Sequence, residues 1–183
     1  AILPDTEITL SNVGLNPTRD GILDVLLEMG ANIRTENRRI VSGEPVGDLV
    51  VRSSKLAGVK IGGEMIPRLI DEIPVLAVAA AYAEGVTEIR DAAELKVKET
   101  NRIAAVAKEL TKLGALVEEL PDGLRITGGK RLKGAALETY HDHRMAMSMA
   151  VAALGAEGDT LINNAEVANV SFPGFFAALD SLR

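Results

Sequence analysis

The sequence predicts an α/β fold in which one unit of strands and helices is used about three times. Segments with strand and helix patterns follow one another along all 183 residues. Similar helix ends also recur, because Leu26–Ala31 (LLEMGA) resembles Leu110–Ala115 (LTKLGA), and Ala83–Thr87 (AEGVT) resembles Ala156–Thr160 (AEGDT). Each contains a glycine that closes a helix before a strand begins. The spacing is too long for a solenoid repeat and suits a unit of two helices and several strands.

Composition favours a single domain with a core of small aliphatic side chains, because 47% of the residues are hydrophobic and only 3% are aromatic. The net charge of -6 argues against a nucleic-acid-binding protein, which needs a basic face. Cysteine is absent, which excludes disulfides and thiolate metal sites. The longest apolar segment, Ile73–Tyr82, is roughly half the length that a membrane span needs. We therefore expect one cytoplasmic domain over residues 1–183, with no membrane or nucleic-acid partner.

The pattern along the chain predicts seven strands, near Glu7–Val13, Asn32–Val41, Asp48–Arg52, Gly85–Ala92, Leu116–Glu119, Leu124–Thr127 and Thr160–Asn163. It predicts five helices, near Pro17–Met29, Asp71–Glu84, Thr100–Leu113, Asp142–Ala156 and Phe172–Leu182. Asn16 before Pro17, and Ser171 before Phe172, have the form of helix starts. Asp71 and Asp142 each head an Ala-rich helix, and the simplest interpretation of both is a cap on the free amides.

The densest polar cluster, Glu94–Arg102, joins a predicted strand to a predicted helix. Lys98, Glu99 and Arg102 share one face if the turn is already helical. Two cations at a helix N-terminus add positive charge where the dipole is already positive, which suits a phosphate or carboxylate ligand as counter-charge. A solvated helix start with an internal ion pair explains the pattern about as well.

A second cluster, Tyr140–Met145, holds both histidines of the chain around one aspartate. It lacks a clear third remote ligand, so a metal site is not favoured. The cluster is either a capped helix with a surface histidine or an anion site formed by Arg144 and His143. Asp71, at the mouth of an apolar helix, suits a general base. If equivalent helix ends meet in space, these groups form one pocket for a multiply anionic substrate, but the pattern names no reaction.

These clusters resemble motifs of the EPSP synthase (3-phosphoshikimate 1-carboxyvinyltransferase) family over essentially the whole chain. Lys98–Arg102 (KETNR) is similar to K-E-[ST]-D-R, Asp142–Met147 (DHRMAM) matches D-H-R-M-A-M throughout, and Ile70–Pro74 (IDEIP) resembles I-D-E-x-P. Asn16–Arg19 and Ser171–Pro173 resemble two further segments of the family. The N-P-T-R segment and the I-D-E-x-P form look more like the glyphosate-tolerant class than the enterobacterial one. The resemblance implies one lobe of the enolpyruvyl transferase fold, with three βαβαββ units, inner helices and outer mixed sheets.

The resemblance also implies a reaction that needs no cofactor and no metal. The enolpyruvyl group of phosphoenolpyruvate moves to the 5-hydroxyl of shikimate 3-phosphate, and phosphate is released. Asp71 would be the base at that hydroxyl, and Glu99 would move the proton at the methylene carbon. The substrate-binding residues that the resemblance implies are Glu94, Lys98, Arg102, His143 and Arg144. Among them, the lysine would contact the shikimate phosphate side and the two arginines would hold phosphoenolpyruvate.

The sequence also departs from the family pattern. Asn101 replaces the usual Asp, which would leave Arg102 less firmly oriented, and Val170 replaces a lysine of enterobacterial members. No G-D-K-S-like segment and no N-x-G-T-x-x-R segment occurs in the chain, although both belong to the family's N-terminal lobe. We therefore expect the C-terminal lobe alone, inactive by itself, with the N-terminal lobe as its partner and one sheet edge open.

Two alternatives stay open at this point. A UDP-N-acetylglucosamine enolpyruvyl transferase has a related fold and the same donor, but the KETNR and DHRMAM segments argue against it. A non-catalytic α/β domain, whose charges only cap helices, belongs to a different class.

Overall fold

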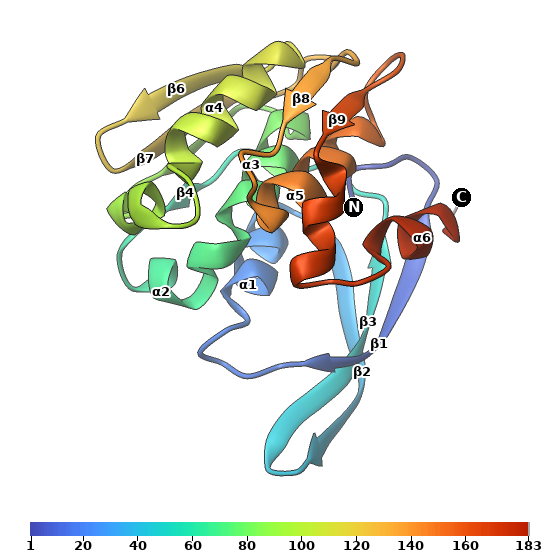
Figure 1. Ribbon diagram of the computed structural model, residues 1–183. Coiled ribbons are helices and arrows are strands. Elements are labelled where there is room, and N and C mark those ends of the chain that lie inside the picture. Colours follow the sequence, from blue (N-terminus) through green and yellow to red (C-terminus); the bar gives the residue numbers. More distant parts are fainter. Residues whose placement is uncertain (183) are drawn as a thin grey trace.

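Three sheets surround a group of helices in the computed structural model, which describes residues 1–182 (Figure 1). A mixed four-stranded sheet has the order β4 (Lys60–Ile61), β5 (Val86–Ile89), β7 (Gly123–Thr127), β6 (Leu116–Leu120). An antiparallel sheet has the order β1 (Glu7–Gly14), β3 (Glu44–Arg52), β2 (Asn32–Val41). The third sheet is a parallel pair of β8 (Ala136–Glu138) and β9 (Leu161–Asn163). Figure 1 shows the long strands β2 and β3 extending away from the helices.

Among the helices, α3 lies deepest in the molecule. The α-helices are α1 (Gly21–Glu28), α2 (Ile66–Leu69), α3 (Ile73–Tyr82), α4 (Arg102–Lys112), α5 (His143–Ala153) and α6 (Phe175–Asp180). Short 3₁₀ turns cover Gly63–Met65, Ile70–Glu72, Ala93–Val97 and Ala165–Val170. Nearly every residue of α3 is buried, because the helix is apolar on all sides and packs against α4, α5 and β7. Within residues 1–182, no helix is long and apolar enough to cross a membrane.

The order of elements confirms the repeated unit. One complete βαβαββ unit consists of β4, α3, β5, α4, β6 and β7, with α2 in its first connection. The elements β1, α1, β2 and β3 repeat its last four, and their strand order β1-β3-β2 matches β5-β7-β6. The elements β8, α5, β9 and α6 repeat its first four. The described residues thus contain one complete unit and two partial ones.

Equivalent backbone contacts support this assignment. The Gly58 amide donates to the carbonyl of Glu84 just after α3, and the Gly134 amide donates to the carbonyl of Glu157 after α5, both at 2.7 Å. Gly30 and Gly114, which end α1 and α4, have φ of 90° and 91°. The echoes in the sequence therefore mark structurally equivalent points.

Two predicted helix starts were wrong. The helix predicted from Pro17 begins at Gly21, and Asn16 forms a turn instead, in which its Oδ1 accepts from the Thr18 amide at 3.0 Å. The helix predicted from Phe172 begins at Phe175, because Ser171 still ends the preceding 3₁₀ turn. The elements β4, β8 and α2, which have two to four residues each, were not predicted.

Candidate active site

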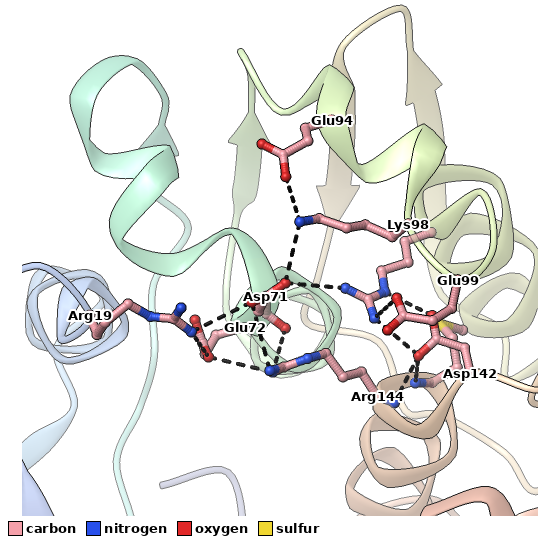
Figure 2. A network of polar contacts seen from close by, with 10 residues as sticks. Arg19, Asp71, Glu72, Glu94, Lys98, Glu99, Asp142 and Arg144 are labelled. Carbon is pink, nitrogen blue, oxygen red and sulfur yellow. Dashed lines mark hydrogen bonds and ion pairs between the residues drawn. The ribbon is translucent and has the colours of Figure 1, made fainter. Parts of the chain in front are cut away.

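Three helix starts converge on one carboxylate, Asp71. It lies in the turn Ile70–Glu72 before α3, while Arg102 opens α4 and Arg144 lies in the first turn of α5. The Asp71 Oδ1 lies 3.4 Å from Nη1 of Arg102 and 3.7 Å from Nζ of Lys98. Its Oδ2 lies 3.5 Å from Nη2 of Arg19 and 3.8 Å from Nη2 of Arg144. Figure 2 shows Arg19, Lys98 and Arg144 reaching toward Asp71 from separate segments.

Arg102 is the most buried of these four cations, with 1% of its side chain exposed. Its Nε and Nη2 donate to the fully buried Asp142 at 2.8 and 3.2 Å, and Nη2 also donates to Glu99 at 2.6 Å. The expectation that Asn101 leaves this arginine loosely oriented was therefore wrong. Asn101 caps α4 instead, since its Oδ1 accepts from the Ala104 amide at 3.2 Å.

Asp142 caps α5, as its position in the sequence predicted. Its Oδ1 accepts from the backbone amides of Arg144 at 2.8 Å and Met145 at 3.4 Å. The same carboxylate holds Arg102, which lies 40 positions earlier. Burial lowers the pKa of Arg102, but the hydrogen bonds that it donates to Asp142 and the charges of the nearby carboxylates raise this pKa by more. The guanidinium therefore stays charged.

The charges around Asp71 control its protonation. Burial raises the pKa of its carboxyl, and the surrounding cations lower it by more, so that the net pKa lies below the ordinary value of 3.8. These cations, in decreasing order of effect, are Arg144, Lys98, Arg102 and Arg19. The cluster therefore holds an ionised carboxylate among cations at neutral pH.

The other predicted residues lie at the margin of the cluster. Glu94 pairs with Lys98, with 2.5 Å between Oε1 and Nζ, and this bond raises the pKa of the lysine. Glu99 is exposed apart from its contact with Arg102. His143 is half-buried at the first position of α5, and within residues 1–182 it forms no hydrogen bond or ion pair with the cluster.

The prediction missed two charged residues of the cluster. Glu72 Oε1 lies 3.4 Å from Nη1 of Arg144 and 3.6 Å from Nη2 of Arg19, while its buried Oε2 has no hydrogen-bond partner. Arg19 belongs to the NPTR segment, which resembles a family segment. The sequence gave no indication that this arginine contacts Asp71. A cavity of about 180 Å³ adjoins this part of the cluster, and its lining includes Asp71, Arg144 and Phe175.

Comparison with known proteins agrees with the motifs. The sequence model of EPSP synthase (3-phosphoshikimate 1-carboxyvinyltransferase) matches residues 1–179. A 3-phosphoshikimate 1-carboxyvinyltransferase of Thermosynechococcus vestitus is 64% identical over 182 residues, which cover 100% of this chain and 41% of that protein. One of Synechocystis sp. is 60% identical over 179 residues, covering 98% of this chain and 40% of that protein.

Solved structures give the same result. An EPSP synthase from Acinetobacter baumannii superposes with a TM-score of 0.96 at 38% identity, covering 100% of this chain and 43% of that chain. The chain thus spans about 40% of the length of the curated relatives that it matches. Both the sequence model and these relatives place this chain in the EPSP synthase family.

Proposed function

We propose that residues 1–183 are the C-terminal lobe of a 3-phosphoshikimate 1-carboxyvinyltransferase and supply part of its active site. The enzyme would transfer the enolpyruvyl group of phosphoenolpyruvate to the 5-hydroxyl of shikimate 3-phosphate in aromatic amino-acid biosynthesis. The observation that carries the proposal is the convergence of four cations on Asp71. Arg102 and Arg144 lie in the first turns of α4 and α5, and Lys98 and Arg19 lie in the segments before α4 and α1. Two anionic substrates need this combination of a base with fixed positive charge.

The proposed reaction divides its proton transfers between two carboxyl groups, Asp71 and Glu99. Asp71 accepts the proton of the 5-hydroxyl as its oxygen attacks carbon 2 of phosphoenolpyruvate. Glu99 delivers a proton to the methylene carbon, which becomes a methyl group in a tetrahedral intermediate. Elimination then returns a methyl proton to Glu99 and breaks the bond between carbon 2 and the phosphate oxygen. The proton held by Asp71 leaves with the phosphate, which restores both carboxyl groups to their starting states. The cations stabilise the anionic oxygens throughout without having to reorganise.

Competition for the cations would prepare Asp71 for its role. The surrounding cations hold the pKa of its carboxyl low, which makes it a weak base. Substrate phosphate and carboxylate oxygens would bind the same N–H groups of Lys98, Arg102 and Arg144. As these contacts shift to the ligand, the pKa of Asp71 rises toward its ordinary range, where it accepts a proton more readily.

The proposal includes a partner and a location. The N-terminal lobe of the same enzyme would face this cluster and supply the missing lysine, arginine and serine contacts to both substrates. A chain without that lobe would bind the substrates weakly and turn nothing over. The enzyme would act in the cytoplasm.

Activity of a chimaera tests the proposal. Residues 1–182 replace the matching segment of the Thermosynechococcus vestitus relative, and phosphate release is measured with both substrates. We expect turnover by the chimaera and none by the 183-residue chain. Glu99→Gln and Arg144→Ala should each lower kcat/KM by about 10²-fold or more. Arg131→Ala, at an exposed ion pair with Glu157, should stay within about twofold.

Two outcomes would contradict the proposal. Turnover unchanged in both Glu99→Gln and Arg144→Ala would remove the enzyme interpretation. Phosphate release by the 183-residue chain alone would show that this chain needs no partner lobe.

A further inference from the structure

We propose that Glu109 and Tyr140 are positioning residues, which hold the turn that presents Asp142 to Arg102. Neither residue contacts Asp71 or the cations around it directly. Their effect on activity rests on the proposed function, whereas their effect on the geometry of Arg102 does not.

The turn before α5 has an unfavourable backbone. The amide of Asp142 donates to the carbonyl of Thr139 at 2.9 Å, which closes a four-residue turn. The two central residues, Tyr140 and His141, have φ of 55° and 56°. Turns with two positive φ angles favour Asn and Gly, because other side chains crowd the backbone there. A tyrosine in this conformation must be held by its surroundings.

Glu109, on α4, fixes this turn by accepting hydrogen bonds from Tyr140 and Glu138. Its side chain is fully buried, at 0% exposure. Its Oε1 accepts from the Tyr140 hydroxyl at 2.6 Å, and its Oε2 accepts from the Glu138 amide at 2.9 Å and from Nζ of Lys112 at 2.7 Å. Burial raises the pKa of Glu109, but these donors lower it by more, so it remains a carboxylate. The segment before Asp142 is therefore fixed at its backbone and at its aromatic side chain.

Helix α4 holds this segment at two points. Arg102 and Glu109 are seven residues apart, which places them two turns apart on one face of the helix. Arg102 binds Asp142, while Glu109 binds Tyr140 and Glu138. If the second attachment is lost, the Asp142 carboxylate can shift relative to the guanidinium that it orients.

The repeat shows that the fold does not need a carboxylate here. The aligned helix ends of α1 and α4 make Val25 the counterpart of Glu109. Val25 is buried at 2% exposure and fills its site with apolar packing alone. A buried charge is costly unless it is fully bonded, and replacing such a group by an apolar one often stabilises a protein. The presence of Glu109 is therefore explained by the hydrogen bonds that it accepts from Tyr140 and Glu138, and not by a requirement of the fold.

Hydrogen exchange at Arg102 tests the geometry without any substrate. The Nε–H exchange rate of this arginine is measured by NMR in the 183-residue chain. Tyr140→Phe should accelerate it by about tenfold or more, because the bond to Asp142 opens more often. The control is Tyr82→Phe, which also removes a partly buried hydroxyl donor, here to the Ala152 carbonyl at 2.5 Å, and should change the rate by less than about twofold. Equal rates in the two variants would overturn the inference.

Kinetics and rescue complete the test. In the chimaera, Tyr140→Phe should lower kcat/KM by about tenfold to a hundredfold, and Tyr82→Phe by less than about twofold. His141→Gly should restore part of the loss, because glycine adopts a positive φ without strain. If Tyr140→Phe does not fold, both tyrosine variants are compared in the His141→Gly background, where the same order of exchange rates is expected and equal rates overturn the inference. An inactive chimaera with no further substitution would refute the proposed function, and the exchange rates would still decide the positioning role.

Discussion

Replacing Asp142 by Asn measures how far Arg102 depends on its buried partner. The two side chains are almost fully buried and 2.8 Å apart. Removing one member of a buried ion pair typically costs about 3–5 kcal/mol, because the other charge is left without compensation. Glu99 and Asp71 remain beside the guanidinium, so we expect the low end of that range, about 3 kcal/mol.

A second substitution separates the charge from the helix cap. Asn is as good a cap as Asp, so Asp142→Asn keeps the bonds to the α5 amides. Asp142→Ala loses both the charge beside Arg102 and the helix cap, so it should destabilise the chain by about 1 kcal/mol more than Asp142→Asn does. The free energy of unfolding is measured in urea at neutral pH by far-UV circular dichroism. Asp159→Asn, an exposed change of the same kind, should stay within about 0.5 kcal/mol of the parent chain. A loss below about 1 kcal/mol for Asp142→Asn would refute the reasoning, because an exposed ion pair contributes that much.

Two further predictions concern acid stability and the repeat. The pKa of Asp71 is lowered in the folded chain, so its contribution to stability is present above pH 3.8 and is lost as the pH falls through the lower folded value. As the pH is lowered from 6 to 2, the free energy of unfolding should fall less steeply in Asp71→Asn than in the parent chain. The slopes should differ by up to about 1.4 kcal/mol per pH unit, and parallel curves would contradict this. Gly58→Ala and Gly134→Ala place a Cβ 2.3 and 2.0 Å from backbone oxygens, whereas Gly14→Ala meets nothing within 4 Å. Thermal unfolding should show a loss of stability of at least about 2 kcal/mol for Gly58→Ala and Gly134→Ala and little for Gly14→Ala. Unchanged stability in either of the first two variants would show that the backbone does not approach that glycine so closely.

The sequence predicted the elements with long, regular patterns and the clusters at their starts. Helices α3, α4 and α5 begin within two residues of their predicted positions, because a capping residue or an apolar run marks each start. Helix α1 was predicted four residues too early. Arg68 donates to the carbonyl of Pro17 at 2.6 Å and pairs with Asp20, so a tertiary contact holds this segment as a turn. No local pattern contains that information.

The partners of the charged residues were also beyond local patterns. Asp142 was recognisable as a cap from its position alone, but its bond to Arg102 depends on how α4 and α5 pack. The role of Asn101 was predicted wrongly for the same reason. The resemblance suggested that Arg102 needs a carboxylate at position 101, but Asp142 and Glu99 orient this arginine instead. Glu109 gave no sign in the sequence of being buried, since a glutamate in a helix is usually exposed.

The four cations around Asp71 differ in freedom, and this makes them unequal as ligand contacts. Arg102 is locked inside the protein, Lys98 and Arg144 are partly covered, and Arg19 has 55% of its side chain exposed. A ligand that binds Arg102 immobilises nothing further, whereas ordering Arg19 costs rotamer entropy of about 1–2 kcal/mol. Equal formal charges should therefore differ in the entropy lost on binding a ligand, which is least for the immobile guanidinium of α4 and greatest for the solvent-facing one of the NPTR segment.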